Sequence, residues 1–352
     1  MARTTPANAG KRPAQVRAGW NLGALAAAAV GVAAAGGIRV VGKRLRSRAE
    51  ADLDNPLDPP VDVTHLHLPT GDGGSLHLVD TGVPDGGSIR PVVLMHGVTL
   101  QWWVWSAVIR LLRPRHRVVA WDMRGHGESR AGSDGVTLEA TAADLVMLIE
   151  ELDLRDVVLV GHSMGGMTLG RFAADHHEFM HERVHALVFV ASSAAPTSQA
   201  AIIGGMATLA GLAARTAGLA ARRPQFTYHW HVGNLSAVLV SMAFGSRPTA
   251  RMIEDVRHME AEMPSGAMAE AASSIATHDV RADLARVDLV SHVLVGSQDK
   301  LTPLIHAREL AGLIEGAELT VVDGIGHQIM QEQPSAVVEV VDAVNARSNV
   351  PR

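Results

Sequence analysis

The fold is decided by the stretch Val157-Val158-Leu159-Val160-Gly161-His162-Ser163-Met164-Gly165-Gly166. Its first four residues are β-branched or aliphatic, which predicts a buried strand. A Gly-x-Ser-x-Gly turn follows, and a helix-like stretch comes after it. In such a turn the residues two before and two after the serine need to be small, and both are glycine here. The pattern therefore predicts a strand–turn–helix that exposes the Ser163 hydroxyl at the carboxyl end of a sheet, with the Met164 N–H directed at the same space.

Two further polar residues follow predicted strands and complete a candidate catalytic set. A serine hydroxyl is a weak nucleophile at neutral pH, so it needs a base and a third group that orients the base. Asp299 follows the apolar strand predicted over Val293–Val295, and His327 follows the one over Leu319–Val322. In open α/β sheets such groups gather at the carboxyl ends of the strands. No carboxylate follows the strand that ends at Val190, where the sequence reads Ala191-Ser192-Ser193-Ala194, and this favours Asp299 as the acid.

The order of elements along the chain predicts an α/β protein with a mostly parallel, doubly wound sheet. Alternating residues on both sides of a Gly-rich turn predict a first hairpin, and short apolar runs separated by helical patterns predict the remaining strands. The predicted strands are Val63–Leu68, Ser75–Asp80, Pro91–Met95, Val118–Trp121, Val157–Val160, Val184–Val190, Val293–Val295 and Leu319–Val322, and the clearest helices are Thr137–Leu152, Pro303–Leu313 and Pro334–Val344. The alternation breaks between Pro196 and about Val290, which indicates a helical insertion lying over the sheet.

Five motifs in this order make the chain resemble the α/β-hydrolases. They are His96-Gly97, Asp122-x-Arg124-Gly125-His126-Gly127-x-Ser129, Gly161-His162-Ser163-Met164-Gly165-Gly166, Gly296-x-x-Asp299 and Gly324-x-Gly326-His327. The resemblance implies an eight-stranded type of sheet with a helical cap after the sixth strand. It also implies Ser163 as nucleophile, His327 as general base and then acid, and Asp299 as the group that orients His327. The oxyanion hole would be formed by the backbone N–H groups of Val98 and Met164.

The resemblance divides the chain into an arm, a core and a cap. The arm and its linker are expected over residues 1–60, the core over 61–195 and 291–348, and the cap over 196–290. The loop with Asp122, Arg124 and His126 is interpreted as structural rather than catalytic.

The charge distribution separates the arm from the rest. Residues 1–49 contain nine basic residues and no acid, which leaves 22 basic and 36 acidic residues for the remainder. An acidic body argues against nucleic-acid binding. The chain has no cysteine, so no thiolate nucleophile or cysteine zinc site is available. His229-Trp230-His231 lacks nearby carboxylate or cysteine, so neither a metal nor another cofactor is expected.

An uncharged, alanine- and glycine-rich run lies within residues 18–41 and is about long enough to cross a bilayer. An uncleaved membrane anchor is the favoured interpretation, because basic residues follow the run at once. A cleaved signal peptide and a soluble alanine-rich helix are the alternatives. The expected location is therefore membrane-associated or exported, and a soluble cytoplasmic location and the oligomeric state stay open.

The cap and the loop after His96 supply the expected substrate pocket. The cap stretch is rich in methionine and aromatic residues, which suit an adaptable apolar pocket, although ordinary cap packing explains most of them. Candidate pocket residues are His96, Trp102, Trp103 and His162.

These features predict a serine esterase or lipase that cleaves an apolar or lipid-like ester through an acyl-enzyme. A thioesterase, a C–C bond hydrolase and a cofactor-free perhydrolase or haloperoxidase-like enzyme are open alternatives on the same triad. From other classes, a non-catalytic binding protein is less favoured, because all three triad candidates are present. A membrane-tethered interaction module, in which the arm is the functional part, is a second rival.

Overall fold

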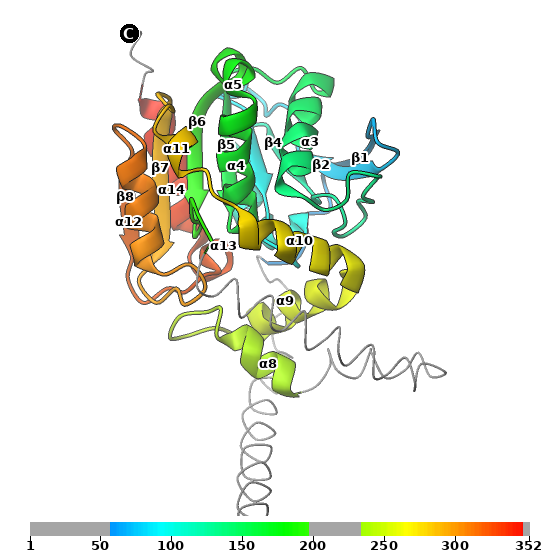
Figure 1. Cartoon of the computed structure of the whole chain (residues 1–352), viewed down its shortest axis with the longest axis vertical. Coiled ribbons are helices and arrows are strands. Elements are labelled where there is room, and N and C mark those ends of the chain that lie inside the picture. Colours follow the sequence, from blue (N-terminus) through cyan, green and yellow to red (C-terminus); the bar gives the residue numbers. More distant parts are fainter. Residues whose placement is uncertain (1–56, 197–233, 348–352) are drawn as a thin grey trace, which may run out of the picture.

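A computed structural model of the protein describes residues 57–196 and 234–347. Its centre is an eight-stranded sheet with the spatial order β1-β2-β4-β3-β5-β6-β7-β8 (Figure 1). The strands are β1 (Thr64–Pro69), β2 (Ser75–Asp80), β3 (Val92–Met95), β4 (Val118–Trp121), β5 (Val157–His162), β6 (Val184–Val190), β7 (Val290–Gly296) and β8 (Glu318–Val322). The predicted α/β class and the mostly parallel sheet are confirmed.

The pairing of the strands places the loops after β3 to β8 at the same end of the sheet. β1 pairs antiparallel with β2, and β2 antiparallel with β4, whereas β4, β3, β5, β6, β7 and β8 are parallel to one another. The central strands are buried along their whole length, as expected for a sheet covered on both faces. The carboxyl ends of β3 to β8 therefore point the same way.

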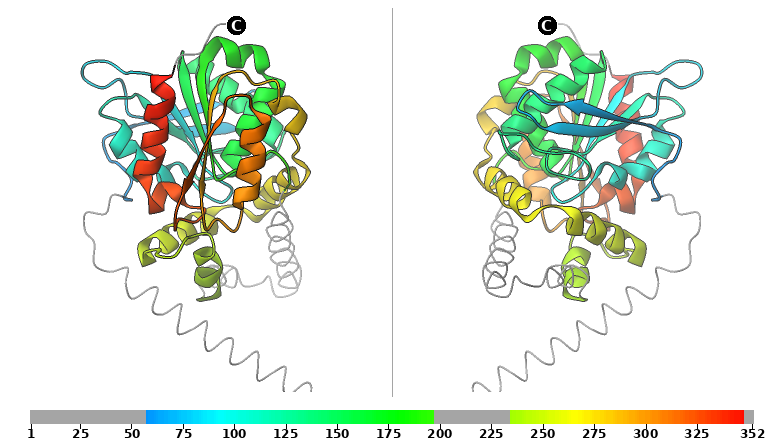
Figure 2. Two further views of the ribbon diagram at one scale, coloured as in Figure 1. Left: turned by 90° about the vertical axis from the view of Figure 1, so that its left-hand side faces the viewer. Right: turned by 90° about the vertical axis from the view of Figure 1, so that its right-hand side faces the viewer.

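Helices cover the two faces of the sheet, as the side views in Figure 2 show. One face packs against α3 (Leu138–Glu151), α4 (Met164–Asp175) and α12 (Leu304–Leu313). The other packs against α2 (Ser106–Leu112) and α14 (Pro334–Ala346). The remaining short elements of the core are η2 (Trp102–Trp105), α5 (His177–Arg183) and α13 (Ile329–Glu332). The predicted helix at Thr137–Leu152 is confirmed as α3, and the Thr137 hydroxyl caps it by accepting from the Ala140 N–H.

The insertion after β6 is confirmed as helical. Its described helices are α8 (Asn234–Ser241), α9 (Ala250–Glu262), α10 (Ser265–Thr277) and α11 (Arg281–Leu284). Helices α8, α9 and α10 lie across the carboxyl end of the sheet (Figure 1), and apolar residues of α9 and α10 join the two cores. Helix α11 instead packs on α4 and α12, so the end of the predicted cap segment covers the core.

The largest difference from the predicted strand bounds is at β7. The apolar run alone indicated Val293–Val295, but β7 begins at Val290 and includes two polar residues. Each of them has a hydrogen-bond partner, because the Ser291 hydroxyl donates to the Leu289 carbonyl at 3.0 Å and His292 Nε2 lies 2.8 Å from Thr320 Oγ1 of β8. Polar residues with such partners interrupt the apolar pattern without interrupting the strand.

Several sequence predictions lie outside the described residues. These are the apolar run at residues 18–41, the cap segment 197–233 and the pair His229 and His231. None of the helices within residues 57–196 and 234–347 is long and apolar enough to cross a membrane.

Candidate functional site

Ser163 occupies a backbone conformation that few residues other than glycine adopt. Its φ is 52° and its ψ is −114°, at the junction of β5 and α4. Three hydrogen bonds hold this turn: the Ser163 N–H donates to the Val190 carbonyl at 2.9 Å, and its own carbonyl accepts from Met167 N at 3.0 Å and Ser192 Oγ at 2.8 Å. The neighbouring strand and the first turn of α4 therefore fix the position of the serine.

The two glycines that flank the turn are required by close packing. A Cβ added to Gly161 would lie 2.4 Å from the Gly165 carbonyl oxygen, and one added to Gly165 would lie 2.6 Å from the Met95 carbonyl oxygen. Both neighbours are backbone atoms, which cannot move aside without distorting β3 or α4. The prediction that these two positions need small residues is explained by these contacts.

Asp299 and His327 form a buried pair at the ends of β7 and β8. His327 Nδ1 lies 2.8 Å from Asp299 Oδ2, and the two residues are 3% and 6% exposed. The other carboxylate oxygen, Oδ1, accepts the N–H groups of Leu301 and Thr302 at 2.8 and 2.9 Å. The carboxylate is thus held in place, and the proton of His327 is directed to Nδ1, which leaves the lone pair of Nε2 free to accept a proton.

Two backbone amides are available next to the serine. Met164 is the first residue of α4, so its N–H has no partner inside the helix. Val98 follows Gly97, whose added Cβ would come within 3.1 Å of the Ser163 Cβ. Neither amide donates to another of the described residues. Free N–H groups beside a serine are what an oxyanion hole requires.

His162 contacts the backbone and the ring of His327. Its Nε2 donates to the His327 carbonyl at 3.0 Å, and the centroids of the two rings are 4.7 Å apart. The ring is fully buried, and burial lowers its pKa well below the ordinary histidine value, so it is neutral. These contacts make His162 a positioning residue for the loop that carries His327.

His96 also has a positioning role. Its Nε2 accepts the Met123 N–H at 3.0 Å and its Nδ1 donates to the Gly97 carbonyl at 2.7 Å, and the ring is fully buried with a pKa lowered by burial. Both nitrogens of this predicted pocket residue are therefore bonded to backbone, and one bond fixes the loop that leads to Val98. A direct contact of His96 or His162 with substrate stays a prediction.

The two tryptophans predicted to line the pocket lie on different sides of the loop. Trp102 is 6% exposed, and its ring packs edge-on to His65 at 5.8 Å on the first hairpin. The half-buried Trp103 lies 6.3 Å from the His258 ring of α9 and donates its Nε1–H to Gln101 Oε1 at 2.7 Å. Trp103 therefore packs between the loop and the cap.

The loop with Asp122 and Arg124 is structural, as interpreted from the sequence. The buried guanidinium of Arg124 binds both carboxylate oxygens of Asp144 at 2.7 and 2.8 Å and also Asp72 at 3.1 Å. Asp122 accepts the Trp102 N–H at 2.8 Å and faces His77 Nδ1 at 2.8 Å. These bonds fix the loop beside the hairpin and leave its charged groups without a free face for catalysis.

Sequence reasoning missed the link between the cap and the His327 loop. The Glu332 carboxylate of α13 accepts the N–H of Gly245, from the cap, at 2.8 Å and that of Gly326 at 3.0 Å. The His327 N–H donates to the Ala243 carbonyl at 2.7 Å. No local motif marks these residues, because Gly245 and Glu332 are distant in the sequence and only the fold brings them together.

Comparison with known proteins identifies the class. The family model described as alpha/beta hydrolase fold matches residues 90–334, so the chain belongs to the α/β hydrolase family. It is similar to a non-heme haloperoxidase from Rhodococcus erythropolis, with 29% identity over 262 residues that cover 69% of this chain and 87% of that protein. It is also similar to 3-oxoadipate enol-lactonase 2 from Acinetobacter baylyi, with 26% identity over 70% of this chain and 85% of that protein.

One further sequence match covers a smaller part of the chain, and two solved structures share its fold. A non-heme chloroperoxidase from Streptomyces lividans is 41% identical over 106 residues, but the match covers only 30% of this chain and 37% of that protein. A thermophilic esterase from Thermogutta terrifontis has 25% identity and a TM-score of 0.65, covering 82% of this chain and all of that one. A bromoperoxidase from Bacillus anthracis, at 17% identity and a TM-score of 0.66 over 81% of this chain and 100% of that one, shares the fold.

Proposed function

We propose that the protein is a serine acyl-transfer enzyme that forms an acyl-enzyme on Ser163. The observation that carries the proposal is the buried Asp299–His327 pair, 2.8 Å apart, at the strand ends next to the Ser163 turn. In the first half-reaction Ser163 Oγ attacks the acyl carbonyl while His327 Nε2 takes its proton. The oxyanion accepts from Val98 N–H and Met164 N–H, and His327 then gives the proton to the leaving group.

The acyl acceptor distinguishes the candidate activities. The similarity to non-heme haloperoxidases over most of both chains favours hydrogen peroxide as an acceptor beside water. In that half-reaction His327 takes a proton from HOOH, the HOO oxygen attacks the ester carbonyl, and Ser163 leaves with the proton returned by His327. The product is a peracid, RC(O)OOH. The peracid then oxidises a halide in solution, RC(O)OOH + Br⁻ + H⁺ → RC(O)OH + HOBr, so no step in this scheme requires a redox cofactor.

Ester or lactone hydrolysis is the second candidate, because it uses the same acyl-enzyme with water as acceptor. The similarity to an enol-lactonase and to a thermophilic esterase favours it. The predicted preference for an apolar acyl group rests on the cap. That segment is rich in methionine and aromatic residues, which suit an adaptable apolar pocket.

Partition of one acyl-enzyme between the two acceptors tests the proposal. The protein is incubated with p-nitrophenyl acetate at increasing hydrogen peroxide, and p-nitrophenol, acetate and peracetic acid are measured separately. We expect peracetic acid to replace acetate as peroxide rises, and Ser163→Ala to lose both products by at least about 10⁴-fold. Ester cleavage that yields only acetate at every peroxide concentration would contradict the perhydrolase activity and would be consistent with hydrolysis alone. Absence of any cleavage on short and long esters would contradict acyl transfer itself.

The membrane-associated arm is a separate proposal that rests on the sequence of residues 18–41. Deletion of residues 1–54 tests it by fractionation. We expect the full chain in the membrane fraction and the shortened chain in the soluble fraction with unchanged ester turnover. Equal distribution of the two forms would contradict an anchor.

A further inference from the structure

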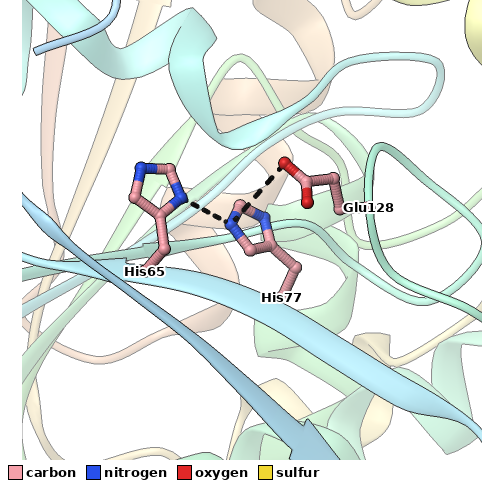
Figure 3. A group of neighbouring side chains, drawn as sticks. All are labelled: His65, His77 and Glu128. Carbon is pink, nitrogen blue, oxygen red and sulfur yellow. Dashed lines mark hydrogen bonds and ion pairs between the residues drawn. The ribbon is translucent and has the colours of Figure 1, made fainter. Parts of the chain in front are cut away.

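Three histidines of the first hairpin and a glutamate from the loop after β4 gather away from Ser163. His65 and His67 alternate along β1 and therefore share a face, and His77 of β2 is the register partner of His67. Figure 3 shows His65, His77 and Glu128 pointing toward one another. His65 Nδ1 lies 2.9 Å from His77 Nε2, and that nitrogen lies 4.0 Å from Glu128 Oε1. His67 Nε2 is 3.9 Å from the other oxygen of Glu128.

The orientation of His77 is the most informative feature of this cluster. The ring is fully buried, and its Nδ1 lies 2.8 Å from Oδ2 of the buried Asp122. Because a carboxylate can only accept, Nδ1 carries the proton and Nε2 keeps its lone pair, aimed at His65 and Glu128. A carboxylate that holds one nitrogen of a histidine while the other nitrogen faces further ligands is the arrangement that supports bound metal in proteins.

We propose that this cluster binds one divalent late transition-metal ion of the Zn²⁺ type. The ligands are His65 Nδ1, His77 Nε2 and a carboxylate oxygen of Glu128, with His67 or water in the fourth position. Imidazole ligands favour Zn²⁺, Cu²⁺ and Ni²⁺ over Mg²⁺ and Ca²⁺, which prefer sites made of oxygen alone. One carboxylate and two or three histidines are a normal ligand set for tetrahedral zinc.

The distances fit such an ion after small side-chain movements. Zn–N bonds of about 2.0–2.1 Å separate tetrahedral ligand atoms by about 3.3 Å. The three ligand atoms all lie within 4.8 Å of one another, and the separations of 2.9 and 4.0 Å bracket the tetrahedral value. His65 and Glu128 are exposed and can adjust, whereas buried His77 stays fixed by Asp122. The side chain of His67 is 53% exposed, so a rotation can bring it in as fourth ligand.

The metal would join the first hairpin to the loop after β4. His65 and His77 belong to the hairpin, Glu128 belongs to the loop after β4, and Asp122 binds the Trp102 N–H at 2.8 Å. The Trp102 ring lies edge-on to His65 at 5.8 Å, so its fluorescence reports on the site. Sequence analysis missed the cluster because its members only meet through strand register, and the expectation of no metal considered His229 and His231 alone.

Metal titration of the metal-free full chain tests the proposal. Zn²⁺ binding is measured by competition with a chromogenic chelator, Co²⁺ binding by visible absorption, and Cu²⁺ binding by quenching of tryptophan fluorescence. We expect one Zn²⁺ per chain and a tetrahedral Co²⁺ spectrum. We expect at least about tenfold weaker binding in His65→Ala and in Glu128→Gln, both of which change exposed side chains.

The chain offers a matched control in its second His-x-His sequence. The double variant His229→Ala/His231→Ala removes the same residue types and is expected to keep full affinity and the Co²⁺ spectrum. The proposal is overturned if the wild type binds no Zn²⁺ at 1:1 stoichiometry. It is equally overturned if His65→Ala and Glu128→Gln bind as the wild type does, or if only the control variant loses binding. These readouts do not depend on Ser163 chemistry, so they separate this proposal from the proposed function.

Discussion

At the scale of single residues, the turn at Ser163 depends on what is missing from its neighbours. The positive φ of the serine is tolerated because β6 and α4 hold the turn through three hydrogen bonds. Gly161 and Gly165 let the strand and the helix approach to a distance that a Cβ would prevent. The exposed position of the hydroxyl is therefore a consequence of backbone packing.

This packing predicts opposite effects for two Gly→Ala changes. Gly161→Ala places a methyl group 2.4 Å from backbone and is expected to lower the free energy of unfolding by about 2 kcal/mol or more. Gly266 is an exposed residue in the first turn of α10, and a Cβ added there would have no neighbour within 4 Å. Gly266→Ala is therefore expected to raise the free energy of unfolding by up to about 1 kcal/mol. Urea denaturation of both variants measures the difference, and equal effects would contradict the packing argument.

The contact between Asp299 and His327 predicts that replacing Asp299 changes the tautomer of the His327 ring. Asp299→Asn keeps the shape of the side chain but can present an N–H to His327 Nδ1, which favours the wrong tautomer of the imidazole. We expect kcat for ester cleavage to fall by about 10⁴-fold at neutral pH, with the far-ultraviolet circular dichroism unchanged. A variant that keeps most of its activity would show that Asp299 does not direct the His327 proton.

At the scale of elements, the cap covers the sheet and also contacts the loop that carries His327. Residues 243–246 run beside the His327 loop, and Glu332 binds both through Gly245 and Gly326. The cap and the His327 loop are thus held by the same carboxylate. Movement of the cap would be transmitted directly to the position of His327.

Glu332→Gln tests this link. The amide can replace only one of the two accepting oxygens, so one N–H loses its partner. We expect kcat to fall about tenfold with little change in KM, and the free energy of unfolding to fall by about 1–3 kcal/mol. Glu339→Gln, an exposed residue of α14, is the control and should behave as the wild type. A selective rise in KM would instead assign Glu332 to substrate binding.

At the scale of the whole molecule, several buried histidines make stability depend on pH. Burial lowers the pKa of His96 and His162, that of His126 to about 3 and that of His278 to about 4. These rings are neutral in the fold but take up protons when unfolded below about pH 6.5. The unfolded state then binds more protons, so their contribution is complete above about pH 6.5 and is lost as the pH falls.

We therefore expect the urea midpoint to fall between pH 7.5 and pH 5.5. Each histidine contributes up to about 1.4 kcal/mol per pH unit within its window. Asp255 acts in the opposite direction, because burial raises its pKa to about 6 and the folded state takes up its proton first on acidification. Asp255→Asn should make the loss below pH 6 steeper. A midpoint that is constant with pH in the wild type would contradict the neutral buried histidines.

The parts of the fold that follow local rules could be predicted from the sequence. β4 and β6 were predicted residue for residue, since strands buried on both faces consist of continuous apolar runs. The start of β7 could not be predicted, because the hydrogen bonds of Ser291 and His292 are not visible in the sequence pattern. Likewise Ser163, Asp299 and His327 belong to motifs, whereas the roles of Glu332 and His77 depend on strand register and on contacts between distant segments.

The central claim is that Ser163 forms a covalent intermediate with the help of His327. Intact-protein and peptide mass spectrometry after reaction with a fluorophosphonate tests it most directly. The account predicts a single adduct per chain on the peptide that carries Ser163, no adduct in Ser163→Ala, and labelling slowed by at least about 10³-fold in His327→Ala. An adduct on another residue, or ester turnover that continues after Ser163 is fully labelled, would contradict it.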